Sequence, residues 1–281
     1  MDSKEVLLIT ASINIKNTPF VTIRDSRERL GEYLMGLIAW IKMPSISTII
    51  FCENTNSSYD FSKIIEFAKN EGKTLEVLTF SGNQGSQKYG KGYGYGRIIE
   101  YAIKHSAYLK DDTDFYLVSG RLFIPEFDQF QKLHADLPTV FKIPAFPPDK
   151  DPWIGLQQLE PKTLAERIKA SIRYWYVFFG RGQGRGPHRY DQSVDLVFFK
   201  SNVKFYKKNL IKSYKRVNDR KTYCLEHIFY QDLVGKQYSS SKMDYTVVGR
   251  MGSTGKYYHQ DYSEEIKHLA KSFLGEDLLK N

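Results

Sequence analysis

The side chains best suited to chemistry gather between residues 90 and 121. Glycines allow a backbone to approach a ligand closely, and lysine and arginine side chains neutralise the charge of a phosphate. A helix that starts after such a glycine run also favours an anion at its amino end. The segment therefore predicts a site for a phosphorylated ligand, formed by Gly90, Lys91, Gly92, Arg97, Ser119, Gly120 and Arg121.

The elements that must position these residues alternate between strand and helix. Short apolar runs predict strands, and an apolar residue at every third or fourth position predicts a helix. The alternation indicates an α/β fold with a mainly parallel sheet flanked by helices, and ligands of such folds bind at the carboxyl ends of the strands. The predicted strands are residues 5–13, 47–52, 74–80 and 115–118, the helices are 25–41, 61–71 and 96–109, and a glycine-rich loop spans 81–95.

The second half of the chain is predicted to be less regular than the first. We divide the chain into a first half, residues 1–125, and a second half, residues 126–281, fused into one compact unit. In the second half we predict helices at 164–179, 202–217, 224–233 and 263–279, strands at 193–199 and 247–255, and loops at 138–152 and 180–190.

Asp112 and Asp114 form an Asp-x-Asp pair, whose carboxylates suit a divalent metal. Both precede the strand at 115–118, whereas a ligand at the carboxyl ends needs groups that follow it, so we expect the pair to cap or solvate a turn. Arg121 does follow the strand, and its planar guanidinium can neutralise a diphosphate by two parallel hydrogen bonds. The prediction is a site that requires no metal, and a divalent ion such as manganese on the two aspartates is the alternative.

Five short motifs occur in order along the first 125 residues. They are residues 10–13 (TASI), 29–33 (RLGEY), 53–54 (EN), 90–92 (GKG) and 119–121 (SGR). In this order they resemble the GT-A-fold glycosyltransferases, and more closely a group of bacterial transferases of surface polysaccharide and lipopolysaccharide synthesis. The resemblance implies a GT-A-like fold and the transfer of a sugar from a nucleotide-sugar donor to a glycan or lipid-linked acceptor. It also implies that residues 1–125 are the nucleotide-sugar-binding half and residues 126–281 the acceptor-binding and catalytic half.

The same resemblance implies roles for single residues of the donor site. The first-strand and second-strand motifs would contact the nucleoside, and the cationic side chains would contact the phosphates. Tyr95 departs from the family pattern, which has an acidic residue in that context. The implied nucleoside contacts are Thr10, Ser12 and Glu53, and the implied phosphate contacts are Lys91, Arg97 and Arg121.

A general base is needed if the transfer inverts the sugar, because the acceptor hydroxyl loses its proton as it attacks. The candidates are Glu226, Asp195 and Asp191. Glu226 is favoured because the resemblance implies a base at a helix start in the second half. A retaining mechanism stays open.

Positive charge concentrates in residues 161–222, where sixteen lysines and arginines stand against four acids, whereas the whole chain carries +9. Such a region predicts an anionic partner, which includes an anionic acceptor. The aromatic residues 174–176, next to basic residues, suggest peripheral contact with a membrane surface. A lid over the donor diphosphate or the acceptor is predicted at Arg181, Arg185, His188 and Arg189.

Two other functions stay open. The first is a basic RNA-binding protein that uses the loop at 180–190, but no recognised nucleic-acid module accompanies that loop, so nucleic acid is not the expected partner. The second is a sugar-phosphate nucleotidyltransferase. We rank it lower because residues 12–16, directly after the first strand, contain no glycine.

The cysteines and the hydropathy pattern bear on the compartment. Cys52 and Cys224 each lie in an apolar run and are expected to be buried free thiols. No run approaches the roughly 18 apolar residues of a membrane helix, and the first residues lack the basic start of a signal peptide. The expectation is a cytoplasmic protein that contacts the inner face of the membrane peripherally.

Overall fold

The computed structural model describes residues 6–15, 18–19, 21–143, 193–221 and 223–274. The strands are β1 (Val6–Ala11), β2 (Thr48–Glu53), β3 (Thr74–Thr79), β4 (Asp114–Ser119), β5 (Val140–Phe141), β6 (Phe198–Asn202) and β7 (Ser239–Ser240). The helices are α1 (Ser26–Ile41), α2 (Ser62–Asn70), α3 (Gln84–Tyr89), α4 (Lys91–His105), α5 (Phe127–Leu133), α8 (Val203–Asn209), α9 (Leu225–Leu233) and α10 (Glu264–Leu274), with two 3-10 turns, η1 (Ser213–Arg216) and η2 (Asp219–Lys221).

One sheet of seven strands organises the described chain, in the order β3-β2-β1-β4-β6-β5-β7. The first four strands in this order run parallel, and β6 runs antiparallel to both β4 and β5. The sheet thus contains strands from both sides of the boundary predicted at residue 125. The predicted fold class, an α/β fold with a mainly parallel sheet flanked by helices and an irregular second half, is confirmed.

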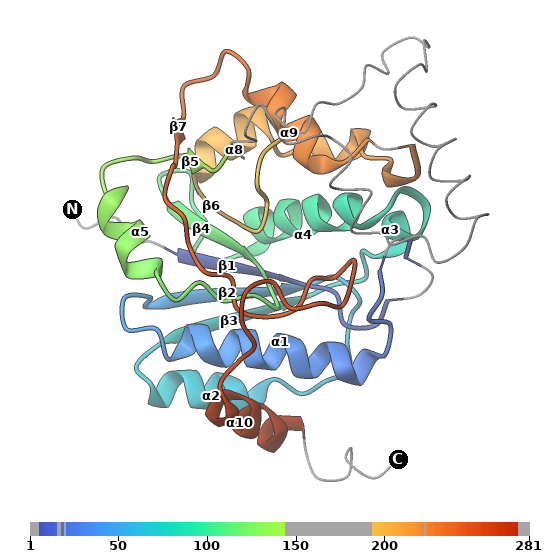
Figure 1. The fold of residues 1–281 in the computed structure, drawn as a ribbon, viewed down its shortest axis with the longest axis vertical. Helices are drawn as coiled ribbons and strands as arrows, with labels where there is room; N and C mark the ends of the chain where they lie inside the picture. The colour runs from blue at the N-terminus through green and yellow to red at the C-terminus, as the bar shows by residue number, and fades with distance from the viewer. Residues whose placement is uncertain (1–5, 16–17, 20, 144–192, 222, 275–281) are drawn as a thin grey trace.

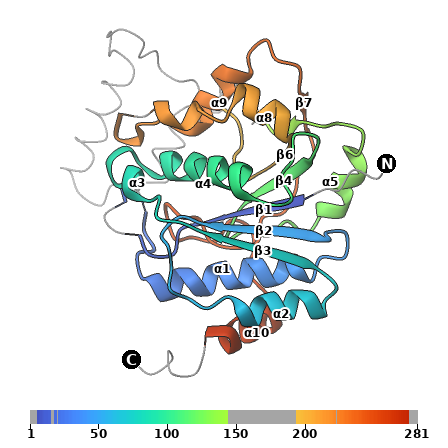
Figure 2. The same ribbon diagram turned by 180° about the vertical axis from the view of Figure 1, so that it is seen from behind.

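Helices cover both faces of the sheet (Figure 1). On one side lie α1 and α2, and α10 packs against α1. On the other side lie α4, α8 and α9, as the view from behind also shows (Figure 2). The connection from β3 through α4 to β4 passes over β2 and β1, so the chain reverses its direction of travel between β1 and β4. Ligands of open α/β sheets bind at such a reversal.

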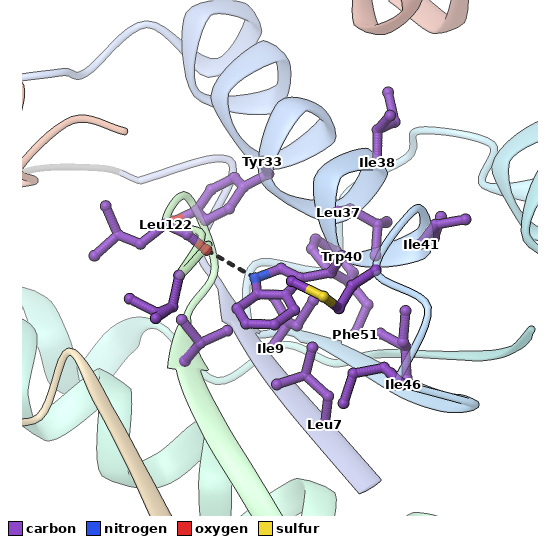
Figure 3. Packing of buried hydrophobic residues seen from close by; sticks show 14 of the residues in the cluster. Leu7, Ile9, Tyr33, Leu37, Ile38, Trp40, Ile41, Ile46, Phe51 and Leu122 are labelled. Carbon is purple, nitrogen blue, oxygen red and sulfur yellow. Dashed lines mark hydrogen bonds between the residues drawn. The ribbon is translucent and has the colours of Figure 1, made fainter. Parts of the chain in front are cut away.

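The side chains of the strands alternate between the two cores. In β1, Leu7 and Ile9 pack towards α1, while Val6 and Leu8 pack towards α4. Strands buried on both faces read as continuous apolar runs, which is why β1 was visible in the sequence. Trp40 fills the α1 side, and its indole N–H donates to the carbonyl of Leu122 at 2.9 Å (Figure 3). This bond ties α1 to the segment that follows β4.

The predicted strands and first two helices of the first half are confirmed, with small shifts at their ends. The loop predicted at 81–95 is wrong, because this stretch contains α3 and the start of α4. Its glycines serve close packing. A Cβ atom on Gly96 would lie 2.2 Å from the Cβ atom of Tyr214, and one on Gly94 would lie 2.1 Å from Ser86 Oγ.

The second half departs further from prediction. Strand β6 begins five residues later than expected because the backbone of Val194 and Asp195 bonds outside the sheet, to Glu226 and Lys142. The helix predicted at 202–217 is divided into α8 and η1. The strand predicted at 247–255 forms only isolated bridges, whereas α9 matches its prediction.

Some predicted elements lie wholly or partly outside the described residues: the helix at 164–179, the loops at 138–152 and 180–190, and the end of the helix at 263–279. Neither of the two cysteines takes part in a disulfide. Cys52 is buried as expected, whereas Cys224 is only half-buried.

The carboxyl ends of β1 and β4 meet with almost no space between them. The N–H of Gly120 donates to the carbonyl of Thr10 at 3.0 Å, and a Cβ atom on Gly120 would lie 2.1 Å from that oxygen. On the other side, a Cβ atom on Gly36 would lie 2.7 Å from the carbonyl oxygen of Gly120. Only glycine fits at residue 120 without moving β1, and only glycine at residue 36 lets α1 pack this closely on the carbonyl of Gly120.

We therefore predict that Gly120→Ala lowers the free energy of unfolding by about 2 kcal/mol or more, because the methyl group meets backbone atoms that cannot move cheaply. Urea unfolding of the purified variant measures this loss. The matched control is Gly31→Ala in α1, whose added methyl group makes only an ordinary 3.5 Å contact with Leu274. Helix propensity should leave that variant as stable as the parent, or more stable by up to about 1 kcal/mol. Equal stability of the two variants would contradict the close approach.

Candidate functional site

A network of buried hydrogen bonds shapes the carboxyl end of β1. The Tyr33 hydroxyl accepts from the N–H of Ser12 at 3.0 Å and from Arg29 Nη2 at 2.9 Å. Arg29 also donates to the carbonyls of Ser12 and Ile23, at 2.7 and 3.0 Å, so its charge is well solvated by the protein. The hydroxyl of Ser12 donates to Asn54 Oδ1 at 2.7 Å and joins this loop to the end of β2.

Arg121 lies directly after β4 and is only 9% exposed. Its guanidinium stacks over the Tyr33 ring at 5.7 Å, on which Arg29 also lies at 5.6 Å. Unlike Arg29, it has a buried nitrogen, Nη1, without a hydrogen-bond partner in the described chain. A buried cation that lacks partners is costly, because it has lost water and gained no replacement. This position is therefore prepared for an anion.

A segment near the carboxyl terminus covers Arg121. Residues 247–260 turn back on themselves, with bridges from Val248 to Gln260 and from Arg250 to Tyr257. In Figure 1 this orange-red segment crosses in front of the sheet before it descends to α10. It comes so close that a Cβ atom on Gly252 would lie 2.4 Å from Arg121 Nη2. Arg121 is thus held between this segment and Tyr33.

Asp195 and Glu226 bring carboxylates to the same edge of the sheet. Asp195 accepts from the N–H of Val197 at 2.8 Å and from the Tyr245 hydroxyl at 3.0 Å. Burial raises the pKa of Asp195 above its usual value, and the negative charge of Glu226 adds to the rise. Glu226 stands in the first turn of α9, half-buried, and its carboxylate has no hydrogen-bond or ion-pair partner among the described residues.

Tyr258 connects the cation with the two carboxylates. Burial, together with the charges of Asp195 and Glu226, raises the pKa of its hydroxyl to about 12, and the charge of Arg121 opposes the rise. All three charged groups are therefore within electrostatic reach of one phenol. The backbone also ties their segments together, because the N–H of Ser119, two residues before Arg121, donates to the carbonyl of Val197 at 3.1 Å, and the N–H of Val194 donates to the carbonyl of Glu226 at 3.2 Å. The fold thus places Arg121, Asp195 and Glu226 at the same edge of the sheet, and their roles as donor contact and candidate bases stay predictions.

The amino end of α4 differs from its predicted role. A carboxylate of the chain itself, Asp219, accepts there from the N–H of Gly92 at 3.2 Å. Gly90, with a φ of 109°, passes so close that a Cβ atom on it would lie 2.2 Å from Asp219 Oδ2. The helix end that was assigned to a phosphate through Gly90, Lys91 and Gly92 is thus already occupied by an anion. Lys91 is exposed beside it.

Two other predicted donor contacts are engaged within the protein. Glu53 is fully buried, and its carboxylate accepts from the N–H groups of Ile13, Thr55 and Ser57 at 2.8 to 3.1 Å. The role it shows is to fix the loops after β1 and β2, and its contact with a nucleoside stays a prediction. Arg97 pairs with Glu100 at 3.2 Å, and its guanidinium lies 5.9 Å from the ring centre of Phe80, which directly follows β3. Thr10 is buried, and its carbonyl holds Gly120.

Asp112 and Asp114 lie at the amino end of β4, the end opposite to Arg121. Asp112 is exposed in a turn, and Asp114 accepts from Asn202 Nδ2 at 2.9 Å. Within the part of the chain that the structure describes, no three His, Cys, Asp or Glu side chains are grouped so that they could hold a metal ion. Asp191 and the predicted lid residues Arg181, Arg185, His188 and Arg189 lie outside the described residues.

Sequence reasoning missed two residues of this edge. Asp219 had one available signal, since it is a lone acid within a strongly basic stretch. Tyr258 had none, because its place depends on how residues 247–260 fold back over the sheet. None of the helices among the described residues has the length and apolar character needed to cross a bilayer.

Comparisons with known proteins give weak likenesses. The chain matches no protein-family model and no curated protein sequence. Among solved structures, the glycosyltransferase GlyE of Streptococcus pneumoniae TIGR4 is similar at 12% identity and a TM-score of 0.44, over 85% of this chain and 46% of that one. A putative glucose-1-phosphate thymidylyltransferase of Bacillus anthracis gives 9% identity and 0.44, over 95% of each chain. TarS 1-349 of S. aureus, in complex with UDP, gives 12% identity and 0.38, over 98% of this chain and 66% of that one.

The chain thus spans less than half the length of the GlyE structure. At these TM-scores the likenesses assign no activity to it.

Asp219, at the amino end of α4, should make the stability of the fold depend on pH. Burial raises the pKa of Asp219 to about 6 from 3.8, although the N–H of Gly92 opposes the rise. The folded state therefore binds more protons than the unfolded state between these values, so this group costs stability as the pH rises from 4 to 7, on the order of 3 kcal/mol. Asp219→Asn keeps an acceptor for Gly92 without the charge. The free energy of unfolding of this variant minus that of the parent should therefore increase as the pH rises from 4 to 7.

Chemical denaturation at a series of pH values measures the effect. The exposed Asp136→Asn exchange controls for the loss of one carboxylate elsewhere. A difference between parent and Asp219→Asn that stays flat with pH would show that Asp219 is not buried on α4.

Proposed function

We propose that the protein is a glycosyltransferase that moves a sugar from a nucleotide-sugar donor to a hydroxyl acceptor. The observation that carries the proposal is the buried guanidinium of Arg121, whose Nη1 lacks a partner, at the carboxyl end of β4. It stands where the sheet reverses its strand order, the usual place for a nucleotide in such folds. The motif order along residues 10–121 supports the same reading.

The donor diphosphate fits Arg121 for electrostatic reasons. A guanidinium forms two parallel hydrogen bonds with phosphate oxygens, and a dry site strengthens each of them. When the sugar leaves, negative charge develops on the terminal phosphate of the nucleoside diphosphate. Arg121 would stabilise that charge in place, so the proposed reaction requires no metal.

Glu226 is the proposed base. In an inverting transfer, the acceptor oxygen forms a bond to the anomeric carbon while the bond from that carbon to the diphosphate breaks, and the hydroxyl proton passes to a carboxylate. Glu226 has a carboxylate with free lone pairs, whereas both oxygens of Asp195 already accept hydrogen bonds. Asp195 is therefore proposed to position the segment between β4 and α9. Asp191 remains a predicted candidate outside the described residues.

The acceptor is proposed to be a glycan or a lipid-linked sugar of surface polysaccharide synthesis. Its support is the resemblance of the motifs in the first 125 residues together with the basic charge of residues 161–222. Binding of one nucleotide among CMP, UDP, GDP and dTDP would identify the nucleotide of the donor.

We predict that Arg121→Gln weakens nucleotide binding about 10-fold to 100-fold, because one or two charge-assisted hydrogen bonds are lost. Thermal-shift titrations with CMP, UDP, GDP and dTDP, with and without manganese, measure the effect. Without ligand, the free energy of unfolding of the variant should be at most about 1 kcal/mol below that of the parent, because the exchange removes a buried group that has no partners. Arg97→Gln is the comparison, and it should keep the affinity of the parent.

Gly252→Ala tests the same group without changing it. The added methyl group would lie 2.4 Å from Arg121 Nη2, the mobile end of a long side chain, so the guanidinium should move while the fold persists. The variant should lose nucleotide affinity as Arg121→Gln does. The proposal of a metal-free donor site is wrong if no nucleotide stabilises the parent, or if nucleotides stabilise it only in the presence of manganese.

We predict that Glu226→Gln lowers the transfer rate by about 10²-fold to 10⁴-fold, the usual contribution of a general base. Nucleotide binding should stay unchanged, because Glu226 touches the acceptor and not the diphosphate. The rate of sugar transfer from the donor that stabilises the protein is the measurement. Asp195→Asn keeps acceptor and donor atoms for Val197 and Tyr245 and should lose less activity. Release of pyrophosphate from a nucleoside triphosphate and a sugar phosphate would instead assign nucleotidyl transfer.

A further inference from the structure

A basic hollow lies on the side of the molecule opposite to α1 and α2. It has a volume of about 390 Å³ and is lined by α8, η1, the residues between them, and Asp232 of α9. Small-ligand sites span about 300–1,000 Å³, so the hollow is large enough for a phosphorylated group. Figures 1 and 2 place α8 and α9 beyond α4, on the far side of the sheet from α10. The cationic side chains that line the hollow are Lys207, Lys208, Lys212, Lys215 and Arg216.

Three of the five cations have carboxylate partners. Lys207 pairs with Asp111 at 2.6 Å, Lys212 pairs with Glu100, and Arg216 pairs with Asp232. These pairs orient the side chains at the rim. They also use up the negative charge that the surrounding elements supply, since Glu100 is shared with Lys104 and Arg97.

Lys208 and Lys215 are the two cations left over. Both are exposed, and neither has a carboxylate partner among the described residues. The lining with its bound carboxylates therefore keeps a charge of about +2, which matches the two negative charges that a phosphate monoester carries near neutral pH. Ile211 supplies an apolar wall beside them.

The hollow is separate from the proposed donor site. None of Arg121, Asp195 and Glu226 lines it. Strand β6 ends opposite the amino end of β4, with Asn202 paired to Asp114, and α8 starts there. The hollow therefore opens from the layer of α8 and α9, and not from the carboxyl ends of the parallel strands. A ligand in it would not meet the reacting atoms.

We propose that this hollow is a second binding site, which takes a phosphate monoester between Lys208 and Lys215. The same chemistry is offered by a phosphomonoester lipid headgroup and by a soluble phosphorylated molecule. In the first case the site attaches the enzyme to an anionic membrane surface, and in the second it binds a free phosphorylated effector or acceptor. Either ligand would complete the charge balance of the lining.

The test compares the parent with the double variant Lys208→Gln/Lys215→Gln. The probes are inorganic phosphate, measured by calorimetry, and phosphatidylcholine vesicles with a minor share of phosphatidic acid, measured by co-sedimentation. The matched control is Lys63→Gln/Lys69→Gln on α2, which removes the same charge from exposed positions on the opposite side. The affinity of the double variant for phosphate should fall about tenfold or more, since two charge-assisted contacts are lost, whereas the control should keep it.

Binding of vesicles by the parent and the control, but not by the double variant, assigns the site to a lipid headgroup. Binding of inorganic phosphate alone, with the same dependence on the variants, assigns it to a soluble ligand. Equal loss in the double variant and the control would mean that net charge alone acts, and no binding by the parent would mean that there is no site. Both results would overturn the proposal. Nucleotide thermal shifts in the double variant should match the parent, which keeps this test separate from the donor site.

Discussion

The close approach of Gly120 to the carbonyl of Thr10 is the constraint on which the site depends. Because β1 and β4 are neighbours whose carboxyl ends touch at this point, the residue after Gly120 is delivered to the place where the sheet reverses. Arg121 then has Tyr33 on one side and Gly252 on the other, and the residue is only 9% exposed. Gly120, which has no space for a methyl group, thereby determines where the next residue lies. That residue is Arg121, whose Nη1 has no hydrogen-bond partner among the described residues.

The distribution of anions within the fold decides which cationic positions can bind a ligand. The amino end of α4 looked like an anion site, but Asp219 neutralises it from a distant part of the chain. Glu100 pairs with Arg97 at 3.2 Å, and the contact of Arg97 with a phosphate stays a prediction. Arg121 has a neighbouring acid, Glu32, whose Oε1 accepts from Arg250 at 3.1 Å and whose buried Oε2 has no hydrogen-bond partner among the described residues. Arg121 itself keeps a buried nitrogen, Nη1, without a hydrogen-bond partner in the same part of the chain.

Ion pairing also distinguishes the basic side chains of residues 161–222 from one another, although they look alike in composition. Residues 161–222 carry a large excess of positive charge, and much of what the structure describes of it is paired, as at Lys207 and Arg216. Lys208 and Lys215, two lysines of this region without a carboxylate partner among the described residues, lie around the hollow, which none of Arg121, Asp195 and Glu226 lines. The proposed donor site, with one buried arginine, and the proposed phosphate site, with two exposed lysines, differ physically, since burial amplifies the first and salt screens the second.

The sequence by itself determined the α/β class, the parallel strands and helices α1, α2 and α9, because apolar periodicity reports directly on which faces are buried. It also brought Arg121 and Glu226 forward, since both stand at the ends of predictable elements. It could not show that the glycines of residues 81–95 are packing contacts, because a glycine in a loop and a glycine beneath Tyr214 read alike. Only the tertiary structure decided that Asp219 fills one anion site and that Arg121 stays unpaired, since such pairing joins residues about one hundred positions apart.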